Sequence, residues 1–328
     1  MKKLFLSAAF LAASLASQAQ QAPLWMRYPA ISPDGKTIVF SYKGDIYSVP
    51  ATGGEARQLT TNAAHDSYPI WSPDGKKIAF ASNREGSFDV YVMSAHGGAP
   101  TRITTNSERE IPVAFKDNDH VLFSANIMPT AESNLFASRE FSQVYEVSTQ
   151  GGRPKLYSVI PMEDISINAK GQVLYHDSKG YEDQWRKHHT SPITRDIWML
   201  DNGKYQKLTT FKGEDRNPVW AADNQSFYYL SEQDGSFNVY RRNIASGKDT
   251  QITHEKKNPI RFLTSSDSGL LCYGFDGEIY PVKEGGQPQK VSISITTDNE
   301  EPSLIRQVQS WGATEIALSP DAKEVAFV

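Results

Sequence analysis

Near-identical stretches recur along this chain. "YPAISPDGKTIVFSY" runs from Tyr28 to Tyr42, and "YPIWSPDGKKIAFAS" runs from Tyr68 to Ser82. Short apolar runs of the same kind end at Phe40, Phe80, Phe123, Tyr175, Tyr229, Tyr273 and Phe327, at spacings of 40 to 54 residues. A repeat of this period indicates structural units that stack on one another, because a single unit cannot bury its own apolar face.

Each unit carries the signals of four strands. A turn signal such as "SPDGK" precedes the apolar run, an alternating run such as "DVYVM" follows it, and a stretch such as "GGAPTRITT" closes the unit. Pro, Asp and Gly suit tight turns, and the β-branched and aromatic residues suit buried strands. We therefore predict an all-β fold, a six-bladed β-propeller of four-stranded antiparallel blades without helices of ordinary length. The same argument makes Asp34 and Asp74 turn residues rather than catalytic ones.

The chain divides into four predicted parts. Residues 1–19 have the two lysines, the apolar run and the small residues at the end of a signal peptide, so we expect an exported protein, periplasmic in a Gram-negative cell. Residues 20–295 form the propeller, 296–313 a linker, and 314–328 the first strands of a second, truncated propeller. A seventh blade of the first propeller is the rival interpretation of this last part. No later stretch is long and apolar enough to span a membrane.

Charge and motifs exclude several classes of function. The formal net charge is −4 with mixed signs, which argues against a nucleic-acid partner. Cys272 is the only cysteine, so one chain cannot form a disulfide framework. We find no G-x-S-x-G, S-x-x-K, H-E-x-x-H or P-loop motif. We therefore expect no catalytic residue, no cofactor and no metal in this chain.

A basic insert lengthens the fourth unit. The stretch "YEDQWRKHHTSPITRD", from Tyr181 to Asp196, gathers the predicted peptide-channel contacts Arg186, Lys187, His188, His189 and Arg195. These side chains would attract peptide carboxylates, because Arg can bind a carboxylate through two parallel hydrogen bonds. Alternatively, the insert is a solvated loop whose cations pair with its own acidic residues. A zinc site at the two histidines is disfavoured, because adjacent residues of a strand point to opposite faces.

The units resemble the repeats of TolB, and the wider layout is similar to the amino-terminal part of bacterial tricorn protease homologues, of the tail-specific (S41-type) serine peptidase class. The residues that carry the second resemblance are "VYEVSTQGGRPKLYSVIPMEDISINAKGQVLYH", the insert, and the restart at "WGATEIALSPDAKEVAFV". The resemblance implies a longer protein, with a second propeller, a PDZ domain and a serine-peptidase core as partners in the same chain. It also implies peptide substrates and leaves assembly with further copies open.

Three functions remain after this comparison. In the first, the propeller gates or channels peptides to or from a peptidase core that lies beyond this chain, so that the whole protein is an enzyme while this part is not catalytic. In the second, it is a TolB-like periplasmic protein-binding propeller without enzymatic activity. A propeller joined to a prolyl-oligopeptidase-type hydrolase is a third alternative. The sequence following Val328 would distinguish among them.

Overall fold

The computed structural model describes residues 23–126, 141–180, 190–296 and 315–327. The chain separates into two units, Met1–Ile295 and Thr296–Val328. Throughout the described ranges the regular structure is β-strand, with no helix. Accordingly, these ranges hold no helix of the length and apolarity that crossing a membrane requires.

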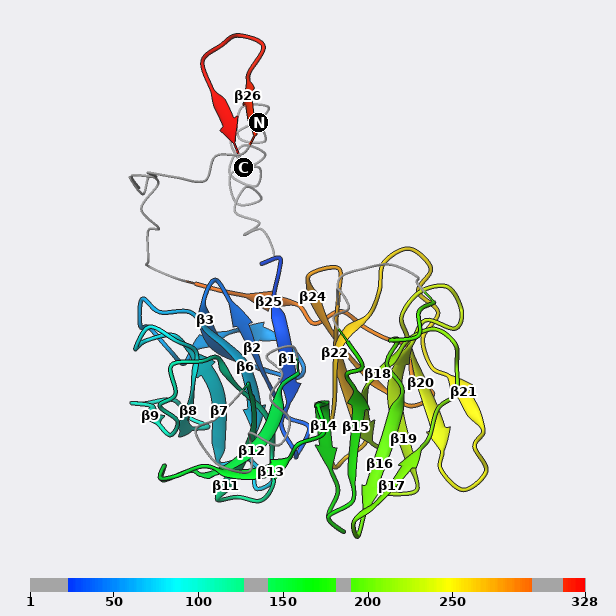
Figure 1. The fold of residues 1–328 in the computed structure, drawn as a ribbon. Helices are drawn as coiled ribbons and strands as arrows, with labels where there is room; N and C mark the ends of the chain where they lie inside the picture. The colour runs from blue at the N-terminus through cyan, green and yellow to red at the C-terminus, as the bar shows by residue number, and fades with distance from the viewer. Residues whose placement is uncertain (1–22, 127–140, 181–189, 297–314, 328) are drawn as a thin grey trace, which may run out of the picture. The chain divides into compact units, whose positions relative to one another are not determined.

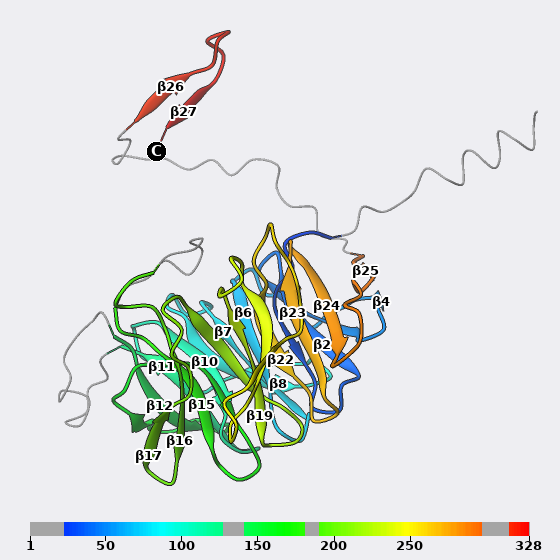
Figure 2. The ribbon, with the colours of Figure 1, turned by 90° about the vertical axis from the view of Figure 1, so that its right-hand side faces the viewer.

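The first unit is a six-bladed propeller of antiparallel blades, as predicted (Figures 1 and 2). The innermost strands are β1 (Arg27–Ile31), β6 (Asp66–Trp71), β10 (Glu110–Phe115), β14 (Met162–Ile167), β18 (Asp215–Trp220) and β22 (Arg261–Ser265). The second strands are β2 (Thr37–Tyr42), β7 (Lys77–Ser82), β11 (His120–Ala125), β15 (Val173–Asp177), β19 (Ser226–Ser231) and β23 (Leu270–Phe275).

The outer half of each blade follows in chain order. The third strands are β3 (Asp45–Pro50), β8 (Asp89–Ser94), β12 (Gln143–Ser148), β16 (Ile197–Asp201), β20 (Asn238–Asn243) and β24 (Glu278–Lys283). The fourth strands of blades one to five are β5 (Arg57–Gln58), β9 (Thr101–Arg102), β13 (Lys155–Ser158), β17 (Lys204–Lys207) and β21 (Asp249–Gln251). The sixth sheet has three strands, and beyond them Val291 N–H donates to Ile279 O at 3.0 Å.

The repeated "SPDG" stretch is the turn between the first and second strands. Ser32 Oγ donates to Asp34 Oδ1 at 2.6 Å and accepts from Thr37 N–H at 3.0 Å, while Gly35 adopts the left-handed φ of +74°. Ser72 and Asp74 repeat this bond at 2.7 Å. Both carboxylates are therefore used inside their turns, which confirms the structural interpretation of Asp34 and Asp74.

The repeated threonine of the "LTT" and "ITT" landmarks joins the end of a blade to its own third strand. Thr60 Oγ1 accepts from Ile46 N–H at 2.9 Å and donates to Asp45 Oδ1 at 3.0 Å. The equivalent hydroxyls accept from Val90, Ile197 and Val239 N–H at 2.8, 3.0 and 2.9 Å. These bonds satisfy backbone groups that are buried where neighbouring blades meet.

Two buried carboxylic acids meet where blades two and three touch. Asp89 and Glu110 are both fully buried, and Asp89 pairs with Arg102 at 2.9 Å. Glu110 accepts a hydrogen bond from Asn106 N–H at 3.3 Å. Burial, assisted by the neighbouring Asp89 charge, raises the pKa of Glu110 to about 7 from 4.5.

No four-stranded sheet of the ring combines strands from blades one and six. The ring closes instead through a short pairing beside blade one. After blade six the chain forms β25 (Ile293–Ser294), which pairs in parallel with β4 (Gly54–Glu55) of blade one. Gly54 N–H donates to Ser292 O at 2.9 Å, and Ala56 N–H donates to Ser294 O at 2.8 Å. We call this pairing the latch.

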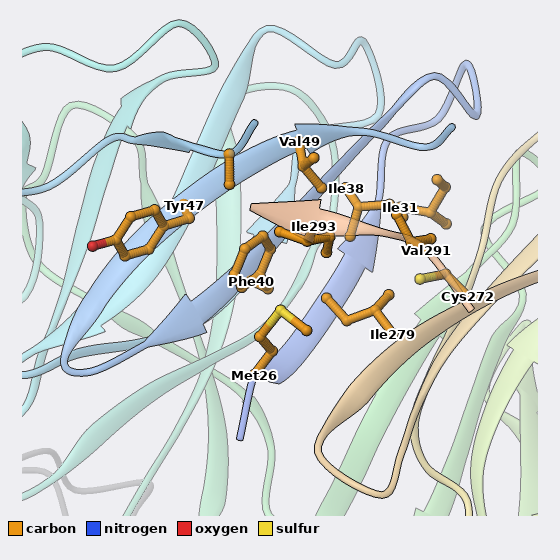
Figure 3. Close-up of a cluster of buried hydrophobic side chains, with 11 residues drawn as sticks. Met26, Ile31, Ile38, Phe40, Tyr47, Val49, Cys272, Ile279, Val291 and Ile293 are labelled. Carbon is orange, nitrogen blue, oxygen red and sulfur yellow. The ribbon is translucent and has the colours of Figure 1, made fainter. Parts of the chain in front are cut away.

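An apolar cluster lies under the latch. Figure 3 shows Ile293 beside Phe40 of blade one and Val291 beside Cys272 of blade six, with Ile279 of blade six close by. All five side chains are buried, and the Cys272 thiol is fully so. Because water is excluded on both sides of the seam, apolar burial and the latch hydrogen bonds stabilise the closed ring together.

The second unit is described as one hairpin, β26 (Ile316–Leu318) paired with β27 (Val325–Phe327). Its turn repeats the bond of the propeller turns, with Ser319 Oγ donating to Asp321 Oδ1 at 2.7 Å. Ile316 and Leu318 are 70% and 66% exposed. The hairpin thus has the local structure of the first two strands of a blade.

The latch can be tested at Gly53. A Cβ atom at Gly53 would lie 2.6 Å from the carbonyl oxygen of Ser292, and Gly53 has a φ of +91°. Gly97, its counterpart in blade two, has a φ of +78°, but its closest contact would be 3.5 Å away. We expect Gly53→Ala to lower the free energy of unfolding by about 1 to 3 kcal/mol more than Gly97→Ala, measured by urea denaturation. Equal losses would mean that the latch contributes nothing.

Glu110 predicts a pH dependence of stability. Its folded-state pKa lies above its unfolded value, so its contribution is most favourable below pH 4.5 and declines as pH rises towards 7. Relative to wild type, Glu110→Gln should gain about 2 kcal/mol of unfolding free energy between about pH 5 and about pH 8. Urea denaturation at both pH values measures this, with the exposed Glu108→Gln as control. If the difference in unfolding free energy between Glu110→Gln and wild type were the same at both pH values, the raised pKa of Glu110 would be contradicted.

Candidate functional site

A channel of about 1030 Å³ runs along the propeller axis. All six innermost strands line it, and its lining reaches from the starts of these strands, near Tyr28 and Asp164, to the turns after them, near Pro73 and Asn118. We call the end at the strand starts the ring face and the other end the turn face. The loops between second and third strands also lie on the ring face, because successive strands are antiparallel.

A bulge near the start of each innermost strand aims one side chain at the channel. The pairing register shifts there in every blade. The residues at or beside these shifts form what we call the mouth ring: Tyr28, Tyr68, Ile111, Asp164, Asn217 and Phe262. All of them except Ile111 have a φ between +48° and +59°. This left-handed conformation is costly for bulky residues, so the surrounding sheet must impose it.

One side of the mouth ring is aromatic. The ring centroid of Tyr28 lies 4.0 Å from that of Tyr68 and 4.7 Å from that of Phe262, across blades one, two and six. Tyr28 Oη donates to Tyr68 Oη at 3.0 Å. The guanidinium of exposed Arg109 lies over the rings of Tyr68 and Phe88, and its Nη2 donates to Tyr68 Oη at 3.2 Å.

The other side of the mouth ring is acidic, and blade four supplies it. The side chains of Glu163 and Asp164 are 37% and 47% exposed. Burial opposes ionisation of Glu163, but the hydrogen bond with His176 and the charge of Arg195 lower its pKa to about 2. His176 Nε2 lies 3.0 Å from Glu163 Oε2, and His176 Nδ1 accepts from Asn217 N–H at 3.2 Å. These partners fix the imidazole behind the channel wall.

The structure places Arg195 inside this network. Arg195 is 7% exposed; its Nε donates to Glu163 Oε2 at 3.3 Å and its Nη1 to Glu214 Oε1 at 3.1 Å. Arg216, which lines the channel, pairs with the same Glu214 oxygen at 2.7 Å. Arg195 therefore does not line the channel itself; it fixes the position of Glu163, which does. The other predicted contacts, Arg186, Lys187, His188 and His189, lie outside the described residues.

Blade three also has an insert, between β11 (His120–Ala125) and β12 (Gln143–Ser148), and the described ends of both this insert and the basic insert lie on the ring face. The ends of the basic insert are tied together where Lys179 pairs with Asp196, and Lys207 pairs with the same carboxylate at 2.8 Å. A smaller pocket of about 230 Å³ lies beside the mouth ring, lined by Tyr68 and Ile111 together with Asn126 and Ser142 from the insert of blade three. Blades three and four thus begin and end their inserts around the mouth of the channel.

The sequence analysis did not predict the mouth ring, although the sequence marks most of its positions with a following proline. Four of its members precede a proline, in Tyr28-Pro29, Tyr68-Pro69, Ile111-Pro112 and Asn217-Pro218. Proline has no N–H for the sheet and occurs in edge strands or at bulges, and the innermost strand is an edge of each blade. As for metals, no group of three His, Cys, Asp or Glu side chains suited to a metal ion is found in the described ranges.

The chain matches a known protein family and resembles solved propeller structures. The family model "Tricorn protease N-terminal beta propeller domain" matches residues 23–288. Among solved structures, the crystal structure of the tricorn protease aligns with a TM-score of 0.72 at 21% identity, covering 93% of this chain and 29% of that chain. This chain therefore spans less than a third of that protease chain.

Other propellers are similar at lower identity. TolB from Acinetobacter baumannii aligns with a TM-score of 0.58 at 15% identity, covering 82% of this chain and 66% of that one. The beta-propeller domain of the Trilobed protease from Pyrococcus furiosus gives 0.50 at 13% identity, covering 81% of each chain. Such low identities support the fold alone. No curated protein sequence matches.

The family match covers more than half of the chain, and the fold agrees with it. This chain belongs to the family of tricorn protease N-terminal beta propeller domains.

Proposed function

We propose that this propeller gates or channels extended peptides to or from the catalytic core of a tricorn-like serine peptidase, with no catalytic residue in the chain described here. The observation that carries the proposal is the axial channel, lined by all six blades, in a chain of this family. A channel bounded by edge strands admits an extended chain and excludes a folded domain by size. In this proposal the protein is exported, and its further propeller, PDZ domain and peptidase core act on the peptides.

The basic insert belongs to the same proposal. Both of its described ends lie on the ring face, so Arg186, Lys187, His188 and His189 are proposed to meet peptides outside the channel mouth. Arg195 is proposed to act one step behind them, because it is ion-paired with Glu163 of the channel wall at 3.3 Å. Assembly with further copies is likewise proposed by analogy with the family.

A second candidate is a TolB-like binding propeller without an enzyme. The similarity of its fold to TolB favours a protein partner. The two candidates differ in what they bind, since a TolB-like propeller would bind a folded partner whereas a peptide channel binds extended chains.

The channel proposal predicts selective binding of extended peptides. An unstructured peptide of about ten residues should bind, while a small folded protein of matched composition should not, measured by isothermal titration calorimetry. Ile111→Trp places a larger side chain at the channel mouth. It should weaken peptide binding by about tenfold, because the indole fills space that the peptide needs. Tyr205→Trp on the exposed outer strand β17 is the control and should leave binding unchanged. Binding of the folded protein with equal affinity, unaffected by Ile111→Trp, would favour the TolB-like candidate.

The proposal also predicts that this chain hydrolyses no peptide. Casein and short peptides should remain intact when incubated with the purified chain, followed by mass spectrometry. Hydrolysis that co-purifies with the chain through several chromatographic steps would overturn the assignment of catalysis to another part of the protein.

A further inference from the structure

The mouth ring is chemically two-sided. In a six-bladed ring, blade four lies opposite blade one, so Asp164 and Tyr28 occupy opposite walls of the channel. Tyr68 and Phe262 of the adjoining blades extend the aromatic wall on either side of Tyr28. The six equivalent positions therefore divide into an aromatic arc over blades six, one and two and an acidic position at blade four.

Two of the three carboxylates of the acidic wall are paired with arginines. Glu163, Asp164 and Glu214 carry three negative charges, and Arg195 and Arg216 supply two positive ones within 3.3 Å of Glu163 or Glu214. His176 Nδ1 accepts the hydrogen bond from Asn217 N–H, which the neutral imidazole permits. Glu163 and Glu214 are thus ion-paired with the arginines, whereas in the described residues Asp164 forms no ion pair with an arginine or a lysine.

Asp164 is also the member of this group that a ligand can reach. Its side chain is 47% exposed, whereas Glu214 is fully buried and Arg195 is 7% exposed. Its φ of +48° directs its side chain from the bulge into the channel lining. Asp164 Oδ2 lies 3.5 Å from His176 Nδ1, which is occupied as the acceptor of the Asn217 N–H. A ligand cation in the channel could therefore pair with this exposed carboxylate.

The aromatic wall selects against the reversed orientation of such a ligand. Arg261 lines the channel beside Phe262, and the guanidinium of Arg109 lies over Tyr68. A cationic group of a ligand is repelled from the guanidinium of Arg109 and attracted to Asp164. The rings of Tyr28, Tyr68 and Phe262 are half-buried and offer stacking surface to an aromatic side chain.

An extended peptide can satisfy both walls at once. Successive side chains of an extended chain point in opposite directions, so adjacent residues of a peptide that follows the channel face opposite walls. We propose that the mouth ring binds peptide segments in which a cationic group adjoins an aromatic side chain, the cation pairing with Asp164 and the aromatic ring packing against Tyr28, Tyr68 and Phe262. This inference rests on the proposed peptide channel and adds a sequence preference to it.

The test uses hexapeptides that differ only at the two central positions. We compare acetylated Gly-Ser-Phe-Lys-Ser-Gly with its Phe-Glu, Ser-Lys and Ser-Ser counterparts by calorimetry on the purified protein. The Phe-Lys peptide should bind tightest. An unacetylated Phe-Ser peptide beginning at Phe asks whether an N-terminal ammonium group can replace the lysine, and binding as tight as that of Phe-Lys supports the proposal with the amino terminus as the cation.

Matched substitutions assign the effect to the two walls. Asp164→Asn should weaken Phe-Lys binding by about two- to fivefold, as expected for loss of a partly exposed ion pair, and leave binding of the acetylated Ser-Ser peptide, which has no cation, unchanged. Asp276→Asn is the control, because Asp276 also has a left-handed φ, +55°, but does not line the channel. Phe262→Asn, which tolerates the same backbone conformation, should weaken Phe-Lys binding by about two- to tenfold and Ser-Lys binding little.

The outcomes separate this inference from the proposed function. If no peptide binds, both fail. If all four acetylated peptides bind alike, and Asp164→Asn changes nothing, the peptide channel stands and the sequence preference is overturned. Tighter binding of Phe-Glu than of Phe-Lys would also overturn the preference, because it would show that Arg109 and Arg261 dominate the mouth.

Discussion

The closure of the ring at one seam is the constraint on which the rest of the structure depends. Five blade junctions are continuous in sequence, whereas the junction between blades six and one relies on the latch of β25 with β4 and on the apolar cluster around Phe40 and Ile279. Seam hydrogen bonds add to it, including Ile31 N–H to Thr264 Oγ1 at 3.2 Å. The channel has defined walls only while this seam is closed, because β1 and β22 must lie side by side to complete its lining.

The mouth ring shows how one backbone device yields chemical asymmetry. Each innermost strand is bulged near its start, and the bulge presents one side chain to the axis whatever its type. Tyr28 and Asp164 therefore occupy equivalent positions with opposite chemistry. The buried pairs of Glu163 with His176 and Arg195 hold the acidic wall in place, while the Tyr28 to Tyr68 hydrogen bond holds the aromatic wall.

Sequence patterns predicted the blades because they report local structure. The Ser32 to Asp34 turn bond involves residues two apart, so "SPDG" indicates it directly. The left-handed backbone of Tyr28 and Phe262 has no such local cause, because tyrosine and phenylalanine disfavour it and the sheet imposes it. Arg195 was predicted as a peptide-channel contact, and the structure places it in ion pairs with Glu163 and Glu214, which lie 32 and 19 residues away; no local pattern predicts such pairs. The latch was beyond prediction for the same reason, since β4 and β25 lie at opposite ends of the unit.

The position of the latch has a mechanical consequence. The chain enters the propeller and leaves it at the same seam, between blades six and one. Where it enters, Met26 N–H donates to Gly277 O at 3.0 Å, and where it leaves, Gly54 N–H donates to Ser292 O at 2.9 Å. Tension applied to the chain on either side of the propeller would therefore act on this seam first, since every other junction is reinforced by covalent backbone. Under such a load the ring would open between blades six and one, and the channel would widen while every blade stays folded.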